Sequence, residues 1–469
     1  MGRLADAPHR VLILGGGRTG RAVAELVHRR GGSSLLADDR AVGTGEQADE
    51  TAAALAEGLP QSCRFVGSSK SDGILSGVDL VVPSPGVPID HPVLAEAVAR
   101  GVDVQSEIEF ASRAIEGRIA AVTGTNGKST TVTLLASILR AGGQRVFVGG
   151  NLGRPLAEAV GEAWDWVVVE ISSFQLEWVS TLRPRIAALL NVGADHIDRH
   201  GSVEVYHRTK LKMFVRMGPE DLAITSRVPS ADGNDDLTAS VRSVTSAPIL
   251  TFGRGTADFR VDRSARRIEG PGNTDFRLPK SWPVAPYDFL NAAAAVAMAV
   301  GAGASREEIE EGLAEFRPLD HRLALVATID GVEFWNDSKA TNVDAALASL
   351  EAFASDVILL AGGVAKGAEL ARLAAGAERI KLLVAYGEAA PELEGELGRK
   401  VRTVCASGLG EAFAVARSQA ACGDKVLLAP ACASFDEFRD YVERGRHFVR
   451  LVEAASAEGA VVEREEADR

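Results

Sequence analysis

Short apolar runs alternate with helix-like segments along the whole chain. The runs are rich in Val, Ile, Leu and Ala, and the segments between them repeat apolar residues every three or four positions. This alternation is typical of parallel β-sheets covered by α-helices, so the pattern predicts an α/β fold. The predicted strands are Val11–Leu14, Ser34–Ala37, Leu80–Val82, Ile119–Val122, Trp166–Glu170, Ile186–Asn191, Val357–Ala361, Leu382–Tyr386 and Lys425–Ala429.

One segment departs from this alternation. From Arg242 to Leu278 the chain is more polar, and its short runs are typical of hairpins, which predicts a small antiparallel patch. Two breaks divide the chain, one near Gln105–Phe110 and one at Phe316–Arg322, where a proline interrupts the chain after a helical segment. The pattern therefore predicts three domains, over residues 1–106, 107–317 and 318–469.

The composition agrees with a folded globular protein and removes several other classes. Of 469 residues, 46% are hydrophobic and 25% are charged, which is ordinary for domains that bury large cores. No apolar run approaches the ~20 residues that span a bilayer, and the N-terminal residues lack the apolar stretch of a signal peptide. The net charge of −13 disfavours a nucleic acid or an anionic membrane as partner, and the four cysteines lack the spacing of a disulfide framework or zinc site. We expect a cytoplasmic protein without such partners, and we also expect a monomer.

The most informative motif follows the predicted strand Ile119–Val122. A glycine turn leads directly into a helical pattern through Gly124, Thr125, Asn126, Gly127, Lys128, Ser129 and Thr130. Such a turn is typical of a loop that binds the phosphates of a nucleoside triphosphate, because backbone N–H groups and the helix dipole favour anions. Lys128 is the expected partner of the β- and γ-phosphates, and Ser129 is the expected Mg²⁺ ligand. Only Thr125 and Asn126 separate the first glycine from the Gly-Lys pair, and this short spacing excludes most P-loop families.

Charged side chains follow the other strands of the predicted central domain. Glu170 ends the run Trp166–Glu170, which is the usual place for a Mg²⁺ ligand beside a phosphate loop. Asp195 and His196 follow the next run; a lone histidine is most often structural, but its position beside an acid at a strand end favours a functional one. Lys210 lies in a helical segment, and its pattern alone indicates a solvent-exposed lysine without a function.

The first predicted domain opens with a glycine-rich turn after its first strand. Gly15, Gly17 and Gly20 fit G-x-G-x-x-G, and Asp38–Asp39 follow the second strand, which is the dinucleotide-binding pattern of Rossmann-like domains. The pattern specifies a pyrophosphate at a helix N-terminus, so it fits NAD and equally a UDP-sugar. A second tight turn, Ser84–Gly86, either contributes to a ligand site at the same sheet edge or only connects two elements.

Taken together and in order, the motifs resemble those of the Mur ligases of peptidoglycan synthesis, and the match runs through all three predicted domains. They read G-T-N-G-K-S-T, V-V-E-I-S-S-F-Q-L-E, N-V-x-x-D-H, Y-x-x-x-K, H-R, N-D-S-K-A-T-N and P-A-C-A-S-F-D-x-F. We therefore expect a Rossmann-like first domain, a P-loop ATPase-like central domain with the small antiparallel patch, and a Rossmann-like third domain. The folylpolyglutamate synthases share the shortened phosphate loop, but they are not expected to show the first-domain glycines or the run Asp337–Asn342 in this form.

The resemblance implies a role for each matching position in nucleotide and metal binding. It implies that ATP contacts Gly124, Thr125, Asn126, Gly127, Lys128, Ser129, Thr130, Asn291, Arg322 and Asp337. It implies that Mg²⁺ is bound by Ser129, Glu170, His196 and Lys210. Lys210 would be carbamylated, because an ammonium repels Mg²⁺ whereas its CO₂ adduct is an anion. The implied catalytic residues are Lys128, Lys210, His196 and Arg322.

The resemblance also implies two further substrates, UDP-N-acetylmuramoyl-L-alanine and D-glutamate. The implied residues of the UDP-substrate site are Gly15, Gly17, Thr19, Gly20, Asp38, Asp39, Ser84, Pro85, Gly86 and Asn151. The implied residues of the amino-acid site are Lys339, Thr341, Lys366, Ser434 and Tyr441. Tyr441 stands where phenylalanine is more typical of the family.

The expected reaction is the ATP-dependent formation of an amide bond. The alanyl carboxylate attacks the γ-phosphate to form an acyl phosphate, and the glutamate amine then displaces phosphate. An NAD-dependent oxidoreductase would leave the phosphate loop and the third domain unexplained. A folate polyglutamylating ligase would use another carboxylate donor in the same reaction. A regulatory protein without activity is the third alternative, and the joint retention of Lys128, Glu170, His196, Lys210 and Arg322 argues against it.

Overall fold

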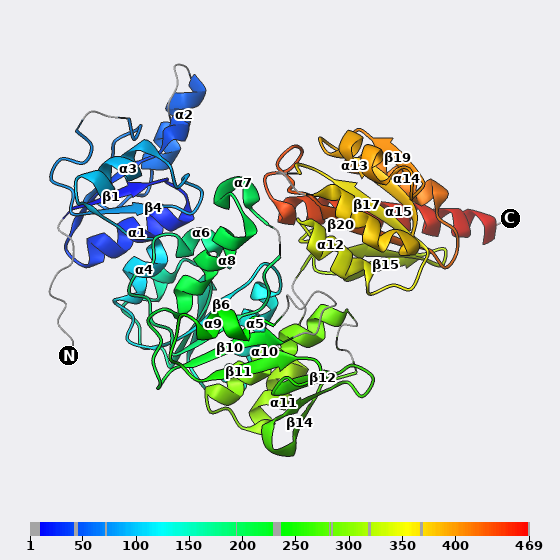
Figure 1. The fold of residues 1–469 in the computed structure, drawn as a ribbon. Coiled ribbons are helices and arrows are strands. Elements are labelled where there is room, and N and C mark those ends of the chain that lie inside the picture. Colours follow the sequence, from blue (N-terminus) through cyan, green and yellow to red (C-terminus); the bar gives the residue numbers. More distant parts are fainter. Residues whose placement is uncertain are drawn as a thin grey trace. The chain divides into compact units, whose positions relative to one another are not determined.

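The computed structural model describes residues 10–41, 46–70, 73–193, 195–227, 236–280, 282, 285–317, 320–365 and 369–467. The described residues form three sheets flanked by helices, which confirms the predicted α/β class (Figure 1). The chain divides into two compact units, residues 1–192, 204–280 and 290–316 in the first and residues 193–203, 281–289 and 317–469 in the second. The first two sheets belong to the first unit, and the third sheet belongs to the second.

The first sheet is parallel and has the doubly wound order β3-β2-β1-β4-β5. Its strands are β1 (Arg10–Leu14), β2 (Ser33–Ala37), β3 (Cys63–Phe65), β4 (Leu80–Pro83) and β5 (Asp103–Val104), and its helices are α1 (Arg18–Arg29), η1 (Asp39–Ala41), α2 (Glu46–Ala56) and α3 (Pro92–Ala99). Val23 and Val27 of α1 pack in one core with Val11 and Ile13 of β1. Because β2 and β4 lie on opposite sides of β1, the loop after β1 stands where the strand order reverses, which is the usual ligand position in such sheets.

The central sheet has the order β14-β13-β12-β11-β10-β9-β6-β8-β7. Its strands are β6 (Arg118–Thr123), β7 (Val146–Gly150), β8 (Trp166–Glu170), β9 (Ile186–Leu189), β10 (Leu222–Arg227), β11 (Ile249–Gly253), β12 (Phe259–Asp262), β13 (Arg267–Gly270) and β14 (Thr274–Arg277). Its helices are α4 (Glu107–Ser112), α5 (Lys128–Ala141), η2 (Leu156–Ala159), α6 (Ser173–Leu176), α7 (Ile197–His200), α8 (Val203–Leu211), η3 (Lys212–Phe214), α9 (Thr238–Arg242), η4 (Pro271–Asn273), α10 (Pro286–Gly301) and α11 (Arg306–Glu315). The inner strand β6 is flanked by β8 and β9, so the phosphate loop at its end meets the ends of two neighbouring strands.

The antiparallel patch is smaller than the sequence predicted. Strand β11 pairs in parallel with β10 and with β12, and antiparallel pairing begins only between β12 and β13 and continues to β14. The patch therefore covers Phe259 to Arg277 and not the whole segment from Arg242. The strand predicted as Ile186–Asn191 also ends earlier, at Leu189, which leaves Asn191 in the loop beyond it.

The third sheet has the order β15-β16-β20-β17-β18-β19, with β15 antiparallel to β16 and the remaining pairs parallel. Its strands are β15 (Ala324–Ile329), β16 (Val332–Asn336), β17 (Val357–Gly362), β18 (Ile380–Tyr386), β19 (Thr403–Ala406) and β20 (Lys425–Ala431), and its helices are α12 (Val343–Leu350), η5 (Leu370–Arg379), α13 (Ala390–Leu397), α14 (Leu409–Gln419) and α15 (Tyr441–Ala467). Leu359 of β17 packs with α12, whereas Leu360 packs with α14 and α15. Adjacent residues of a strand thus face two cores, and the continuous apolar run of β17 follows from burial on both sides.

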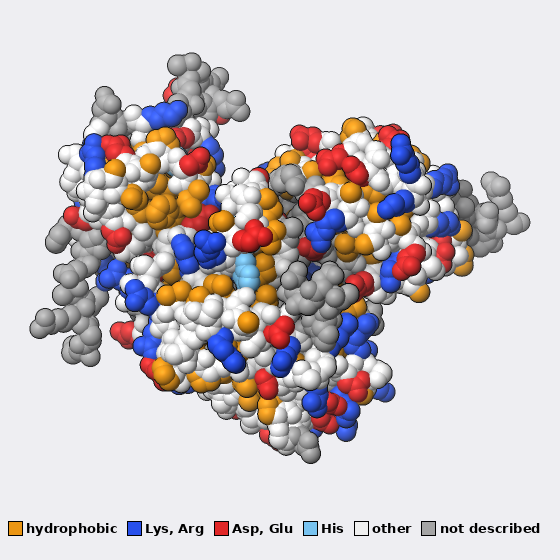
Figure 2. All heavy atoms as spheres, in the orientation of Figure 1, with side chains coloured by type: hydrophobic (Ala, Val, Ile, Leu, Met, Phe, Trp, Pro, Cys, Tyr) orange, Lys and Arg blue, Asp and Glu red, His pale blue; other side chains and the backbone are white. Residues whose placement is uncertain are grey.

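The surface mixes charges of both signs. On the face shown in Figure 2, Lys and Arg side chains are interspersed with Asp and Glu, and no broad area of one sign stands out among the described residues. Over the same described ranges, none of the helices has the length and apolar character that crossing a membrane requires.

Candidate active site

The phosphate loop between β6 and α5 is fixed by a glycine and a neighbouring helix. Gly127 has φ +87°, and a Cβ placed there would lie 2.1 Å from Oδ1 of Asn291 on α10. Both its backbone conformation and this close approach require glycine. Helix α5 begins at Lys128, so its dipole favours an anion at this loop. The buried Nδ2 of Asn291 has no hydrogen-bond acceptor among the described residues, which leaves a donor for a ligand beside the loop.

Asn191 holds the phosphate loop from the neighbouring strand end, a role that the sequence did not indicate. Its side-chain Oδ1 accepts from the N–H of Asn126 at 2.8 Å, and its Nδ2 donates to the carbonyl of Asn126 at 3.1 Å. Its own carbonyl accepts from the N–H of Thr125 at 3.1 Å. The two middle residues of the loop are therefore paired before any nucleotide binds. The available signal was an asparagine just beyond β9, the strand beside β6.

Glu170, Ser129 and Asn151 form a polar cluster at the end of β8. The hydroxyl of Ser129 donates to Oε2 of Glu170 at 2.6 Å, and Nδ2 of Asn151 donates to Oε1 at 2.7 Å. Glu170 is 3% exposed, and these two hydrogen bonds hold its buried carboxylate in place. A hydroxyl and a carboxylate in contact beside a phosphate loop fit Mg²⁺, which takes one or two protein oxygens and completes its shell with phosphates and water. Asn151, which was expected to contact the muramoyl substrate, therefore lies beside the proposed Mg²⁺ ligand Glu170.

Two lysines converge on the carbonyl of Gly124. Nζ of Lys128 donates to this oxygen and Nζ of Lys210 does so as well, each at 2.9 Å, and Lys128 also reaches the carbonyl of Thr125 at 2.7 Å. Lys210 is 1% exposed, and its ammonium lies 4.3 Å from the centre of the Tyr206 ring. The expectation that its pattern alone gave, a solvent-exposed lysine, is wrong. Burial, and after it the charge of Lys210, lowers the pKa of the adjacent His207.

In the second unit, the partly buried Arg322 lies near enough to the buried carboxyl of Asp337 to act on it electrostatically. Ser349 of α12 donates to Oδ2 of Asp337 at 2.5 Å, and burial raises the pKa of Asp337 to about 6 despite this bond and the charge of Arg322. Burial also raises the pKa of Asp288 to about 7. The guanidinium carbon of Arg322 lies 5.7 Å from the ring centre of Tyr287. The sequence indicated Arg322 and Asp337 but missed Tyr287 and Asp288, which come from the start of α10.

Of the expected amino-acid residues, Lys339 and Tyr441 are in direct contact. Nζ of Lys339 donates to the Tyr441 hydroxyl at 3.3 Å and lies 5.0 Å from the centre of its ring. Thr341 continues the same loop, where its N–H donates to the carbonyl of Lys339 at 2.9 Å. Ser434 is buried in the loop after β20. Lys366 lies outside the described residues.

His196 adopts a left-handed backbone conformation, with φ 55°, at the start of α7. Its N–H donates to Oδ1 of Asp195 at 3.0 Å, and Nδ2 of Asn342 donates to Oδ2 of the same carboxylate at 3.3 Å. His196 belongs to the second unit and Lys210 to the first, so their grouping around one metal stays a prediction.

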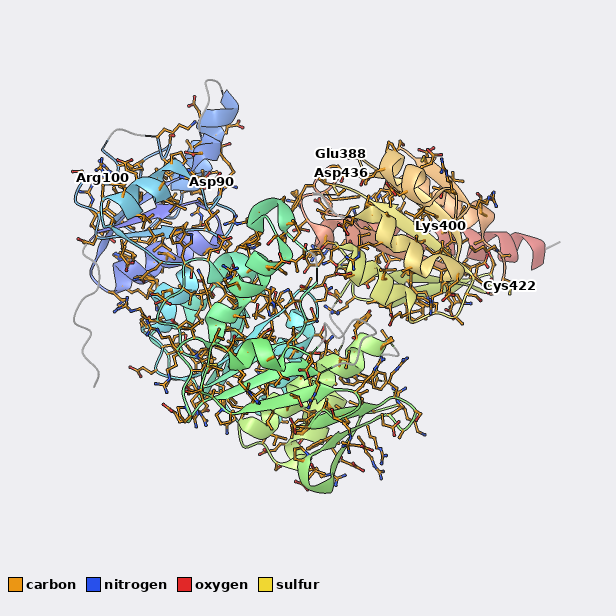
Figure 3. The ribbon with its side chains drawn as sticks, in the orientation of Figure 1. Asp90, Arg100, Glu388, Lys400, Cys422 and Asp436 are labelled. Carbon is orange, nitrogen blue, oxygen red and sulfur yellow. The ribbon has the colours of Figure 1, made fainter. Side chains whose placement is uncertain are left out.

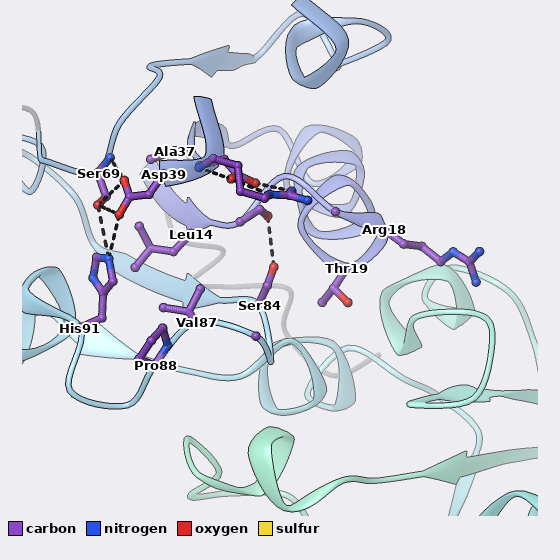
Figure 4. Close-up of a pocket in the computed structure, with 15 residues that line it drawn as sticks. Leu14, Arg18, Thr19, Ala37, Asp39, Ser69, Ser84, Val87, Pro88 and His91 are labelled. Carbon is purple, nitrogen blue, oxygen red and sulfur yellow. Dashed lines mark hydrogen bonds and ion pairs between the residues drawn. The ribbon is translucent and has the colours of Figure 1, made fainter. Parts of the chain in front are cut away.

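A pocket of about 430 Å³ lies at the carboxyl edge of the first sheet (Figure 4). The predicted residues that line it are Gly15, Gly17, Thr19, Asp38, Asp39, Ser84 and Gly86. Gly20 does not line it and instead allows close packing, since a Cβ there would lie 2.0 Å from the carbonyl oxygen of Gly15. Pro85 and Asn151 are not among the lining residues either. Arg40, Ser69, Val87, Pro88 and His91 line it without having been predicted.

The two adjacent aspartates of this pocket have different surroundings. Asp38 accepts from the N–H of Gly16 at 2.7 Å and from the guanidinium of Arg40 at 2.9 and 2.6 Å, so its carboxylate braces the glycine turn. Asp39 accepts from the N–H and hydroxyl of Ser69 and lies 3.3 Å from Nε2 of His91 (Figure 4). Burial alone would raise the pKa of each carboxyl. The hydrogen bonds together outweigh it, so the pKa of Asp38 and that of Asp39 are both lowered.

The neutral tautomer of His91 follows from the start of α3. Its Nδ1 accepts from the N–H of Val93 at 3.3 Å and so caps the helix. In the neutral ring the other nitrogen, Nε2, then carries the hydrogen and donates toward Asp39. The His-Pro pair before a helical run was the sequence signal for this cap. Ser69 and His91 thus hold the carboxylate of Asp39 in the pocket.

The phosphate loop of the central sheet, with the carboxylate of Glu170 bonded to its Ser129, defines a nucleotide-binding enzyme of the α/β class. Family models agree along the chain: the N-terminal domain of MurD-like Mur ligases matches residues 9–106, the Mur ligase middle domain matches 122–299, and the Mur ligase glutamate ligase domain matches 321–432. The chain belongs to the Mur ligase family.

Two similar curated relatives carry the same name. A protein of Syntrophus aciditrophicus is 39% identical over 461 residues, covering 95% of this chain and 98% of the relative. A protein of Anaeromyxobacter dehalogenans is 40% identical, covering 94% and 97%. Both are named UDP-N-acetylmuramoylalanine–D-glutamate ligase.

Solved structures share the fold at low sequence identity. The MurF ligase of Thermotoga maritima in complex with ADP has a TM-score of 0.62 at 17% identity, covering 96% of this chain and 95% of that one. The UDP-N-acetylmuramate-alanine ligase of the same organism has a TM-score of 0.59 at 19% identity, covering 96% and 100%. FolC of E. coli, in complex with DHPP and ADP, has a TM-score of 0.56 at 19% identity, covering 80% and 99%. The fold is thus common to ligases of several substrates, and the named relatives favour the D-glutamate ligase over the folate alternative.

Proposed function

We propose that this protein joins D-glutamate to the alanyl carboxylate of UDP-N-acetylmuramoyl-L-alanine and converts ATP to ADP and phosphate, as a step of peptidoglycan precursor synthesis. The observation that carries the proposal is the phosphate loop Gly124–Thr130, with Glu170 hydrogen-bonded to its Ser129, in a chain whose relatives of about the same length bear this name. We place the reaction in the cytoplasm, where nucleotide-linked precursors and ATP are available, and we propose a monomer as the active form.

The first chemical step is phosphoryl transfer to a carboxylate. A free carboxylate is a poor acyl donor, and attack of its oxygen on the γ-phosphorus yields an acyl phosphate and ADP. The protein contributes position and charge and no covalent nucleophile. Lys128, which now donates to two carbonyls of its own loop, would turn its ammonium to the transferred phosphoryl group. We propose Arg322 as the second cation at the phosphates, because a guanidinium can bind two phosphate oxygens at once.

Magnesium fits beside this loop. Ser129 and Glu170 would hold it, because their hydroxyl and carboxylate already meet and because the phosphates supply further oxygens. When bound, Mg²⁺ neutralises charge on the triphosphate.

A carbamate on Lys210 fits the same surroundings. As an ammonium, Lys210 shares the carbonyl of Gly124 with the ammonium of Lys128, and like charges this close repel each other. Addition of CO₂ to the amine would replace the repulsion by attraction to Lys128 and would create a metal ligand. We propose His196 as the companion ligand and as the candidate that accepts a proton from the incoming amine.

The second chemical step is attack of the glutamate amine on the acyl phosphate. The tetrahedral intermediate collapses with loss of phosphate, and the amide remains. Lys339, Thr341, Ser434 and Tyr441, together with Lys366, are the proposed binding residues for the amino acid. Two carboxylates require cationic and hydroxyl donors of this kind. The pocket of the first sheet is the proposed seat of the UDP group, with its pyrophosphate at the start of α1.

A phosphate-release assay tests the proposal. Purified protein with ATP, Mg²⁺ and UDP-N-acetylmuramoyl-L-alanine is given D-glutamate, L-glutamate or D-aspartate in parallel, and 7,8-dihydropteroate with L-glutamate tests the folate alternative. We expect phosphate release that requires both the UDP substrate and D-glutamate. Phosphate release that depends on the pteroate substrate, or that is the same with and without an amino acid, would refute the proposal.

A further inference from the structure

Arg444 is a buried cation that the proposed reaction does not use. It lies in the first turns of α15, and it is 1% exposed, which places it among the largest fully buried side chains of the described chain. Arginine is almost never buried this completely without a partner of opposite charge. The hydrogen-bond partners and nearby carboxylates of Arg444 therefore indicate the function of its charge.

All hydrogen bonds of Arg444 end on neutral oxygens. Nε donates to the hydroxyl of Ser338 at 3.0 Å, and one terminal nitrogen donates to the carbonyl of Ser338 at 2.9 Å. Both terminal nitrogens also donate to the carbonyl of Cys432, each at 3.2 Å. Within the described part of the chain no carboxylate lies within ion-pair distance of the guanidinium. Each of the three nitrogens thus has an acceptor and four of the five N–H groups are used, but the charge itself is not neutralised.

The carboxylates nearest in sequence, Glu443 and Asp440, make other contacts: Oε2 of Glu443 accepts from Nε of Arg439 at 3.1 Å, and Oδ1 of Asp440 accepts from the N–H of Glu443 at 2.8 Å. The next two acids, Asp436 and Glu437, are also paired with other segments. Oδ2 of Asp436 accepts from the N–H of Glu388 at 3.2 Å, and Figure 3 shows these two residues beside each other. Oε2 of Glu437 accepts from the N–H of Leu409 at 3.0 Å, at the start of α14. These acids brace the loop after β20 against two other segments and leave Arg444 without a counter-ion. A buried charge of this kind is costly, and its electric field favours a negative charge bound at the neighbouring loops.

Arg444 also joins the loops that carry the proposed amino-acid residues. Ser338 directly precedes Lys339 in the loop after β16, and Cys432 stands two positions before Ser434 in the loop after β20. Strands β16 and β20 are parallel neighbours, so both loops leave the same edge of the sheet. The hydroxyl of Ser338 in turn donates to the carbonyl of Tyr441 at 2.8 Å, which extends the connection to the start of α15.

We propose that Arg444 is a positioning residue that makes the amino-acid site selective for a side-chain carboxylate. Its guanidinium holds the Ser338 and Cys432 loops in register, and its unneutralised charge favours an acidic amino acid over its neutral amide. This inference rests on the proposed function, since it assigns the origin of selectivity at that same site.

The test compares Arg444→Met and Arg444→Lys with Arg446→Met, which removes an exposed charge two residues along the same helix. The measurements are KM for D-glutamate, KM for ATP, kcat, and the inhibition constant of D-glutamine against D-glutamate. For Arg444→Met we expect KM for D-glutamate to rise about tenfold or more, because the loss is that of a unit charge in a partly screened interior. We expect KM for ATP to stay within about threefold and the preference for D-glutamate over D-glutamine to shrink by a similar factor of about ten.

Arg444→Lys keeps the charge but cannot reproduce all four hydrogen bonds, so it should retain more of the preference for D-glutamate over D-glutamine than Arg444→Met does. If Arg444→Met does not fold, the test rests on Arg444→Lys. Loss of the preference for D-glutamate over D-glutamine in this folded variant overturns the role of the charge, and retention of that preference supports it. Two results with an active wild type would overturn the inference. One is an Arg444→Met enzyme whose preference for D-glutamate over D-glutamine is unchanged, and the other is an equal rise in its KM for D-glutamate and its KM for ATP. A wild type that shows no D-glutamate-dependent phosphate release overturns the proposed function itself.

Discussion

Replacement of Asn191 by alanine tests whether the phosphate loop is organised before nucleotide binds. The substitution removes two hydrogen bonds, from the N–H of Asn126 and to its carbonyl, but it leaves the backbone bond from Thr125 to residue 191. A net hydrogen bond contributes about 0.5–1.5 kcal/mol, so the loop loses about 1–3 kcal/mol of preorganisation. If this free energy is needed to order the loop on binding, nucleotide affinity falls by roughly 5- to 150-fold.

The assay is calorimetric titration of each variant with ADP and Mg²⁺, with thermal denaturation as the control for folding. Asn191→Asp retains the acceptor for the Asn126 N–H but sets a charged oxygen against the Asn126 carbonyl and near the phosphates, so its affinity for ADP should be no higher than that of Asn191→Ala. A folded Asn191→Ala protein that binds ADP within twofold of the wild type would show that the loop is ordered without this side chain and would refute the reasoning.

Lys128→Ala should abolish substrate-dependent ADP formation, because no other side chain within the first unit is proposed to neutralise the transferred phosphoryl group; a rate above one tenth of wild type, measured by coupled ADP detection, would contradict that role. Lys210→Ala should lose activity and regain part of it with added formate or acetate, which could stand in for the carbamate, and no recovery over a range of concentrations would argue against the carbamate. Burial raises the pKa of Glu107 from 4.5 to about 7, so the folded state keeps a proton that the unfolded state has lost. Stability should therefore fall by roughly 3 kcal/mol as pH rises from about 4.5 to about 7 and then level off. Glu107→Gln should remove this contribution, so equal pH profiles of urea unfolding for both proteins would contradict the buried, proton-retaining carboxyl.

The sequence predicted those parts of the fold that local pattern determines. Strand β6, the glycine turn and α5 were recoverable because apolar periodicity and glycine chemistry act within a few residues. The run β17 was recoverable because burial on both faces makes every position apolar. The antiparallel patch was placed too broadly, since β11 is as short as the hairpin strands that follow it, and only its pairing with β10 shows that it is parallel.

What the sequence pattern missed is the surroundings of these residues, which depend on contacts between distant parts of the chain. Lys210 reads as a solvent-exposed lysine in α8, and its burial arises from a loop 86 positions earlier in the chain. Arg444 likewise reads as a surface arginine of α15, whereas it ties loops at Ser338 and Cys432. Asp38 and Asp39 are equivalent in the sequence pattern, and only the positions of Arg40 and Ser69 distinguish the carboxylate that braces the turn from the one held in the pocket. The order of motifs can single out residues such as Lys210 and Asp39, but it does not predict which residues they contact.

The transfer of oxygen-18 tests the central claim, that the phosphate loop serves to activate a carboxylate, most directly. UDP-N-acetylmuramoyl-L-alanine labelled in both oxygens of its alanyl carboxylate is incubated with the protein, ATP, Mg²⁺ and D-glutamate, and the released phosphate is analysed by mass spectrometry. Attack of the carboxylate on the γ-phosphorus predicts one oxygen-18 atom in each phosphate and one in the amide carbonyl of the product. Unlabelled phosphate, formed at the same rate as the amide, would mean that ATP is cleaved by water and would contradict the account.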